Sequence, residues 1–334
     1  MAVYRIFPEK DTFISSQKPD SNAGLDEIIE IGNYTHFGVT EVSRGRVQFS
    51  DTDLDFVKSI ADLSSITSSF KMYLASAESV PTEYTLEMYP LSHSWINGTG
   101  KFDDSTNPKD GITWNTTGSN EWYLISGGLE THGMRSTHDT SINITSGVLS
   151  HMNREIPNNG FVIKLEDSLE NNNDLDFKLN YFSIDTNTIY PPHLEVGWND
   201  VTRVTGSREE ITTTNLLFNI NNKGEYTNEG KQKFNITVRP KYPPRTFGTQ
   251  SIYLNNYLLP EESYWGLKDY DNGMMVVDFS NNTRISANEE GSFFTMYMNG
   301  LQPERYYKLV VKTEIDGSTL VLDDEIIFKI IENV

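Results

Sequence analysis

The sequence contains no cysteine among its 334 residues. Disulfide bonds and thiolate metal sites are therefore both excluded, as is typical of a protein that folds in a reducing compartment. Packing and hydrogen bonding must stabilise the fold. Because a single core rarely keeps growing to this length, we expect two domains, or three.

Basic residues are also scarce, with 27 lysines and arginines against 47 acids and a formal net charge of -20. Nucleic-acid affinity depends mainly on clustered cations that release counterions, so nucleic acid is not an expected partner. An acidic surface keeps copies of a chain dissolved. Association of copies is then expected to rely on local apolar or cation-bridged patches.

Long apolar runs are absent as well. Residues 1–8 have neither a basic leader nor an apolar stretch of secretory length, and no later stretch approaches the roughly 20 apolar residues that a membrane helix needs. We expect a chain that is synthesised in a cytoplasm and has no membrane partner.

Short apolar segments separated by Gly, Pro and Asn are abundant from residue 1 to residue 197. The segment 82–90 alternates, with Tyr84, Leu86 and Met88 on one face, and 43–49 is rich in β-forming residues. This pattern predicts an all-β fold of two antiparallel β-sandwich domains in series, the first at 1–197 and of jelly-roll type. Residues 198–208 are expected to form a linker.

Two segments of this first domain depart from the strand pattern. Apolar residues at helical spacing in 53–61, behind Ser50 as an N-cap, predict a short helix, and 146–152 predicts another. Residues 97–121 are polar and rich in Gly and Asn, which predicts a long ordered loop.

Residues 209–334 alternate more regularly and predict a sandwich of the immunoglobulin or fibronectin III type. Expected strands include 211–220, 251–254, 319–322 and 326–331. The spacing Leu-x-Pro-x-x-x-Tyr at 301–307 is similar to a tyrosine corner, in which the phenol bonds to the backbone upstream. Tyr307 is the structural candidate, with Tyr306 as the alternative register.

Several motifs of residues 1–197 resemble a known family in order along the chain. They are residues 11–14, 22–24, 43–49, 71–74, 113–115 and 191–196. Their layout is similar to that of the disaggregatase-related (DNRLRE) β-sandwich domain. That resemblance implies a fold related to carbohydrate-binding modules, including modules that bind alginate.

Three segments carry a closer resemblance, at residues 4–14, 22–32 and 187–196. They resemble virion structural proteins of T4-like marine phages of the cyanophage type. This resemblance implies a place in the neck, tail or baseplate, other virion proteins as partners, and location in the virion after synthesis in the host cytoplasm. It supplies no catalytic residues.

Candidate ligand-binding residues fall into three groups, each with a structural interpretation that we favour. Calcium candidates are Asp269, Asp271 and Asn272, although Asp-Asn-Gly also forms ordinary hairpin turns. His132 and His138 have no metal-ligand spacing and are expected to be solvated loop residues. Aromatic residues around the long loop could stack on sugars or anchor the loop; they are Trp95, Trp114, Trp122 and Tyr123.

Arg44 and Arg46 lie on one face of a predicted strand, where we expect them to pair with acids such as Glu30 or Asp26. The sequence predicts a non-enzymatic structural protein without a required cofactor, assembled as a homo-oligomer in a symmetric ring. The alternative is a carbohydrate-binding module that contacts a host cell-surface glycan. A weaker alternative is a hydrolytic tail enzyme.

Overall fold

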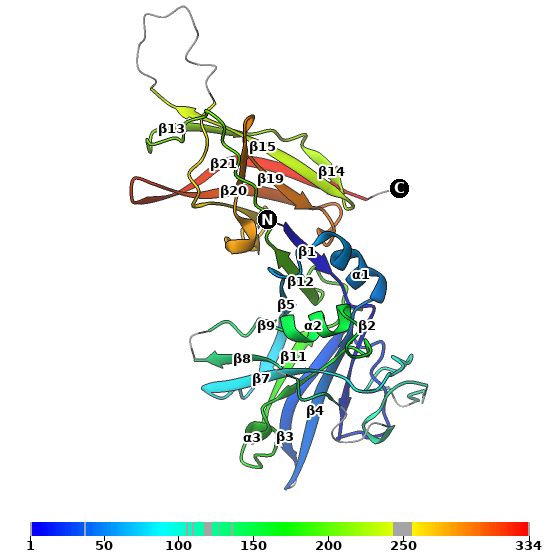
Figure 1. Ribbon diagram of the computed structural model, residues 1–334. Coiled ribbons are helices and arrows are strands. Elements are labelled where there is room, and N and C mark those ends of the chain that lie inside the picture. The colour runs from blue at the N-terminus through cyan, green and yellow to red at the C-terminus, as the bar shows by residue number, and fades with distance from the viewer. Residues whose placement is uncertain are drawn as a thin grey trace, which may run out of the picture. The chain divides into compact units, whose positions relative to one another are not determined.

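The computed structural model describes residues 2–36, 38–104, 106–108, 110–116, 122–125, 127–134, 136–242 and 256–332. Nearly all regular structure in these ranges is β-strand, which confirms the predicted all-β sandwich class (Figure 1). The chain divides into two compact units. One is Arg5–Val196, and the other is Gly197–Val334 together with Met1–Tyr4.

The unit Arg5–Val196 is built from two sheets. The smaller has the order β1 (Ala2–Ile6), β12 (His193–Trp198), β5 (Thr67–Met72) and β9 (Thr140–Asn143). The larger has the order β6 (Leu74–Glu78), β11 (Phe177–Phe182), β3 (Ile28–His36), β4 (Val39–Gln48), β10 (Phe161–Leu165), β7 (Glu83–Pro90) and β8 (Gly128–Gly133), and β2 (Lys10–Ser15) also pairs with β4. Every pairing in the larger sheet is antiparallel.

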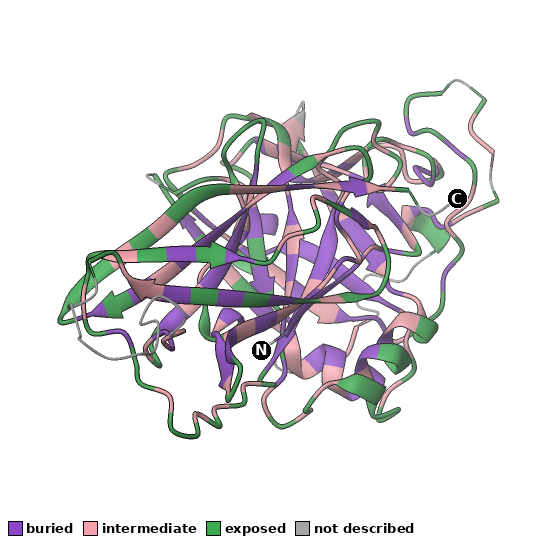
Figure 2. Cartoon of the chain, turned by 90° about the horizontal axis from the view of Figure 1, so that it is seen from above, coloured by how far each residue is buried: buried purple, intermediate pink, exposed green. Residues whose placement is uncertain are grey.

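Side-chain alternation places the core of this unit between its sheets. In β7, Tyr84, Leu86 and Met88 are buried, as the sequence predicts, and the intervening residues are more exposed. The same alternation gives many strands a striped appearance in Figure 2. Phe49 makes ring contacts with Phe70 and Phe161 inside this core.

Both helices predicted for this unit are present. Helix α1 (Asp51–Ile60) begins at Ser50, whose side chain accepts a hydrogen bond from the backbone N–H of Thr52, and it buries Leu54 and Val57. Helix α2 is Thr145–Met152, and a short α3 is Asp167–Glu170. Across the described residues, no helix is long and apolar enough to span a membrane.

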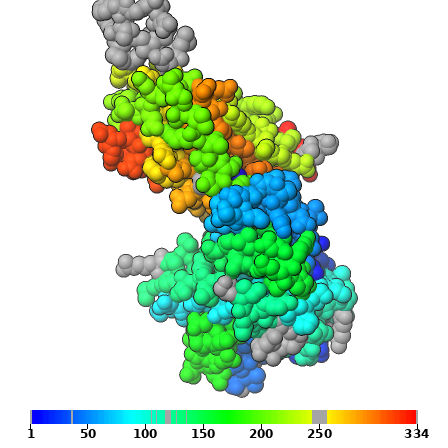
Figure 3. Space-filling model, viewed as in Figure 1, coloured from blue at the N-terminus to red at the C-terminus, as the bar shows by residue number. Residues whose placement is uncertain are grey.

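The outer face of the larger sheet is covered by the described part of residues 91–127, which we call the covering loop. Trp95 and Ile112 of this loop pack with Ile14 of β2 and Val162 of β10 in a second apolar cluster. Consequently β2 and β10 are buried along nearly their whole length instead of alternating. Atoms of the covering loop, in cyan to blue-green, form part of the surface in Figure 3.

Asn22 holds the covering loop in place. Its side-chain amide donates to the backbone carbonyls of Asn97 and Ile112, at 2.7 and 3.0 Å, and its Oδ1 accepts from the backbone N–H groups of Gly24 and Gly100. Asn22 is completely buried. A Cβ atom at Gly24 would lie 2.3 Å from the Asn97 carbonyl oxygen, so only glycine permits this approach.

The second unit has two sheets around one apolar core. One sheet has the order β13 (Leu216–Ile220), β15 (Lys231–Pro240), β19 (Gly291–Tyr297) and β18 (Ser286–Asn288). The other has the order β14 (Glu225–Thr227), β21 (Ser318–Ile331), β20 (Tyr306–Ile315), β16 (Ser263–Asp269) and β17 (Met275–Val277). Trp265 and Phe234 stack on Phe294 in the core.

In this unit the structure differs from two of the sequence predictions, and a third falls outside the described residues. The two strands expected at 319–322 and 326–331 form one strand, β21, because a register shift opposite Val310 absorbs residues 323–325. The expected linker 198–208 is hydrogen-bonded to β18 through Val204 and Thr202, a short pairing that leaves no apolar pattern in the sequence. The strand expected at 251–254 lies outside the described residues.

Tyr307 makes the contact expected of a tyrosine corner. Its side chain is buried, and its phenolic oxygen accepts a hydrogen bond of 2.9 Å from the backbone N–H of Gln302. Tyr306, the alternative, is 47% exposed. The bond ties the turn before β20 to the strand itself.

We predict that Asn22→Ala destabilises the Arg5–Val196 unit by several kcal/mol, because buried backbone donors and acceptors would lose their partners at about 1–3 kcal/mol each. Urea unfolding followed by tryptophan fluorescence measures the effect. Asn115→Ala is the control, since Asn115 is exposed and bonds to Asp20 at the surface. Equal stability of the two variants would contradict a supporting role for Asn22.

Candidate functional site

The described residues best suited to ligand chemistry gather beneath the covering loop, on the outer face of β4 and β10. Arg44 of β4 donates from Nε and Nη2 to the two carboxylate oxygens of Glu170, both at 2.7 Å. Glu170 is the last residue of α3, and its side chain is 3% exposed. The planar guanidinium and the carboxylate therefore form a bidentate pair shielded from water.

Lys164 of β10 extends the charge cluster. Its ammonium lies 3.1 Å from Oε2 of Glu87, 2.7 Å from Oδ1 of Asp167 and 3.7 Å from Oε2 of Glu170, although the side chain is 1% exposed. Burial acts to lower the pKa of Lys164, but the surrounding carboxylates outweigh it and raise the pKa. Lys164 is therefore charged at neutral pH and committed to these partners.

Two of the candidate tryptophans contact Arg44. The centre of its guanidinium lies 5.2 Å from the ring of Trp114 and 5.2 Å from the ring of Trp122. Trp122 also stacks against Tyr89, with ring centroids 6.4 Å apart and planes 20° from parallel. Cation–π and stacking contacts of this kind fasten the covering loop to the sheet.

The other two aromatic candidates differ in exposure. Trp95 is 6% exposed, its Nε1 donates to the carbonyl of Asn159 at 2.9 Å, and the Lys10 ammonium lies 4.4 Å from its ring. Tyr123 is half-buried beside Leu124, which is 88% exposed. Glycan binding by these residues stays a prediction.

The prediction that Arg44 pairs with an acid such as Glu30 or Asp26 is wrong about which acid. Glu30 instead accepts from Lys178 and from the hydroxyl of Ser43, and Asp26 accepts from the backbone N–H of Phe102. Glu170 is 126 residues from Arg44 in sequence, and α3 carries it to the sheet. Arg46 lies on the same face as Arg44, between Thr12 and Val162, and is 3% exposed.

We predict that Glu170→Ala lowers the free energy of unfolding by about 3–5 kcal/mol, because it leaves Arg44 buried without its carboxylate. Asp167→Ala is a matched control, since it removes an exposed carboxylate from the same cluster and should cost less than about 1 kcal/mol. Chemical denaturation measures both. Similar losses in the two variants would mean that burial of the pair does not matter.

The prediction that His132 is a solvated loop residue is wrong. His132 belongs to β8, directly opposite Tyr84 of β7, and is 2% exposed with its ring stacked on Tyr84 at 4.9 Å. His138 is half-buried, and its Nδ1 lies 3.1 Å from the Tyr84 hydroxyl. The tyrosine thus draws both imidazoles toward the sheet, a cross-strand contact without a signature in local sequence.

A charged group on the smaller sheet was missed by the sequence reasoning. Glu195 of β12 lies 3.2 Å from Nη2 of Arg5 and 2.9 Å from Nζ of Lys71, which joins β1, β12 and β5. Burial acts to raise the pKa of Glu195, but Arg5 and Lys71 outweigh it and hold the pKa at about 2. The sequence signal for this group was weak: Glu195 is a charged residue at an alternate position of a predicted strand.

Asp11 is a second buried carboxyl. It is 1% exposed; Oδ2 accepts from the backbone N–H of Ile184 at 2.8 Å, and Oδ1 has no hydrogen-bond partner among the described residues. Burial raises the pKa of Asp11 from 3.8 to about 7, with a further contribution from Asp185, and the Ile184 bond opposes the rise. The carboxyl therefore exchanges its proton near neutral pH.

The free energy of unfolding of the wild type should fall between about pH 4 and pH 7. We predict that Asp11→Asn abolishes this fall. Because the folded-state pKa is raised, the folded chain binds this proton more tightly, so the wild-type free energy of unfolding falls as pH rises through that window, by a few kcal/mol at most. Thermal melts across the window measure the difference. Asp174→Asn, at an exposed position, is the control and should track the wild type.

The calcium candidates form a hairpin turn between β16 and β17. Oδ1 of Asp269 accepts from the backbone N–H groups of Asp271 and Asn272, and Oδ2 pairs with Arg305. Both carboxylate oxygens thus have partners within the protein. In the part of the chain that the structure describes, no three His, Asp or Glu side chains are placed to share a metal ion.

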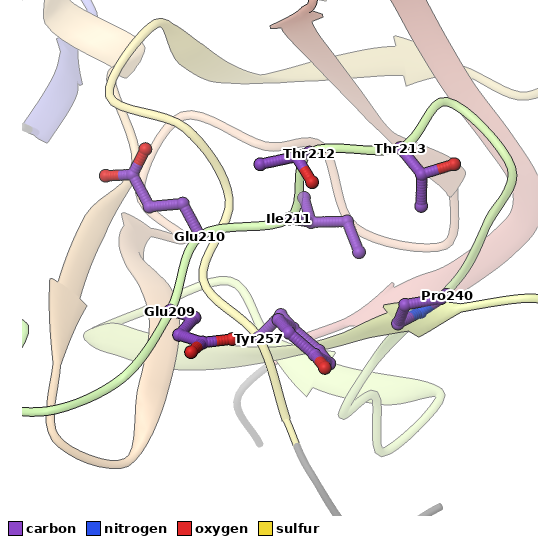
Figure 4. A pocket seen from close by; sticks show the side chains of 7 residues that line it. All are labelled: Glu209, Glu210, Ile211, Thr212, Thr213, Pro240 and Tyr257. Atoms are coloured by element: carbon purple, nitrogen blue, oxygen red, sulfur yellow. The ribbon is translucent and has the colours of Figure 1, made fainter. Parts of the chain in front are cut away.

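A cavity of about 500 Å³ lies in the second unit (Figure 4). Its lining residues are Glu209, Glu210, Ile211, Thr212, Thr213, Pro240 and Tyr257. In Figure 4 the two carboxylates extend to opposite sides of the 209–213 segment, and Glu210 pairs with Arg203. They therefore do not converge on one point, as the paired carboxylates of a glycosidase must.

A scan against protein-family models finds no match, and a search of curated proteins finds none. Among solved structures, a β-glucuronidase from Parabacteroides merdae aligns with 98% of this chain and 36% of the enzyme chain, at 7% identity and a TM-score of 0.18. This chain spans about a third of that enzyme, and so low a score carries no argument about fold or activity.

Proposed function

We propose that the chain is a non-enzymatic structural component of a tailed-phage virion, in the neck, tail or baseplate. It assembles there in several copies through the surfaces of its β-sandwiches. The resemblance of residues 4–14, 22–32 and 187–196 to virion structural proteins of marine phages supports this role. The two compact, β-rich units are consistent with a structural role of this kind.

One structural observation carries the proposal. Trp95, Trp114 and Trp122 have their rings or ring nitrogens occupied by groups of the protein, and Arg44 has a carboxylate partner. Side chains that in a sugar-binding site would face the ligand thus hold the covering loop to its sheet. Their use in the fold favours a scaffold over a glycan-binding module.

The alternative function keeps one specific point in its favour. Tyr123 and the exposed Leu124 lie at one end of the covering loop, where an aromatic ring beside apolar surface suits a sugar face. Saturable binding of a host cell-surface glycan that is lost in Tyr123→Ala but kept in a folded Leu124→Ala would favour this alternative.

We expect quantitative mass spectrometry of purified phage particles to detect the chain in a constant ratio to the other virion proteins. A structural component should stay with the particles through density-gradient purification, while abundant non-structural proteins of the same lysate are depleted. Loss of the chain together with those non-structural proteins would contradict the proposed virion role.

A further inference from the structure

The sheet β13–β15–β19–β18 has one face toward the apolar core and one outer face. Phe234, Ile236 and Val238 of β15 point into the core, so the alternate residues point outward. The outward residues of the three longer strands are Lys231, Lys233, Asn235, Thr237 and Arg239 of β15, Leu217 and Asn219 of β13, and Phe293, Thr295 and Tyr297 of β19.

These outward positions include three cations and no acid. The strand register places Lys231 opposite Tyr297, and the Lys233 ammonium lies 4.1 Å from the centroid of the Phe293 ring. We call Lys231, Lys233, Arg239 and Phe293 the basic strip. The nearest acids along the chain, Glu229 and Glu290, lie in turns outside β15 and β19.

Such a strip is unexpected in a chain of net charge -20. The acidity is concentrated elsewhere, since the unit Arg5–Val196 carries 28 acids and 13 lysines and arginines. The chain therefore contains both a basic, partly aromatic sheet face and a strongly acidic unit. Opposite charges on two different surfaces favour contact between copies and disfavour contact between like surfaces.

We propose that the basic strip binds the acidic Arg5–Val196 unit of a second copy of this chain. The contact joins two different surfaces, so it is heterologous, and repeated contacts of this kind generate a ring if the rotation closes or a filament if it does not. Phe293 supplies apolar area beside the charges, as is common at interfaces, whereas Tyr297 packs against Tyr4 and Trp198 of the same chain. The inference rests on the multi-copy assembly proposed above and names a surface for it.

The test is self-association of the full-length chain by sedimentation velocity, at about 0.02 M and about 0.5 M salt, where screening differs strongly. We expect wild-type association at low salt that high salt weakens. Lys233→Glu should weaken the low-salt association at least about tenfold, or about 1.4 kcal/mol. Lys233→Gln, which removes the charge without reversing it, should have a smaller effect in the same direction.

Lys223→Glu is the matched control. Lys223 is exposed in the turn before β14, in the same unit, and its reversal changes the net charge by the same amount. Association of this variant should stay within about twofold of the wild type, well inside the tenfold criterion. Thermal melts of all three lysine variants verify that each is folded.

Four results would overturn the proposal. A wild-type chain that stays monomeric at every concentration and salt would do so, as would equal weakening by Lys233→Glu and Lys223→Glu, which reports net charge alone. A monomer that binds heparin or single-stranded DNA through Lys233 would assign the strip to a polyanion. If particles contain the chain but Lys233→Glu has no effect on association, this surface fails and the virion role stands.

Discussion

The structure of the Arg5–Val196 unit depends on the exclusion of water from both faces of β2, of β10 and of the 43–47 part of β4. A sheet that is covered on one face can leave polar side chains of its other face in solvent. These strands are covered on both faces, so their polar side chains cannot reach solvent in this way. Each charge on their outer face must therefore have a partner inside the protein. The Arg44–Glu170 pair and the carboxylates around Lys164 meet this requirement.

The same constraint explains the form of the covering loop. A long polar segment over an apolar surface would leave its backbone groups without partners, and Asn22 supplies three of those hydrogen bonds from one buried side chain. Trp114 and Trp122 then fasten the loop through cation–π contacts with Arg44. A segment whose composition suggests a binding loop thus serves to cover the outer face of the larger sheet. In the second unit the outer face of β15 is not closed in this way, and its polar residues point to solvent.

Features that depend on neighbours in sequence could be predicted. The alternation of Tyr84, Leu86 and Met88, the N-cap of α1 at Ser50 and the bond from Gln302 to Tyr307 each involve residues within a few positions of one another. Contacts across strands, or between segments that are distant in sequence, could not be predicted. Glu170 reaches Arg44 from a different part of the chain, and His132 is buried because the register places it opposite Tyr84.

The amino-acid sequence alone determined the all-β class, the positions of the two main helices and the strongly acidic character, because periodicity, capping residues and charge are local or additive properties. Tertiary structure alone decided which carboxylate pairs with Arg44, that Trp114 and Trp122 contact Arg44, and that an acid-free basic strip faces outward on β15. Those outcomes depend on strand order and register, which bring together residues that no local pattern relates.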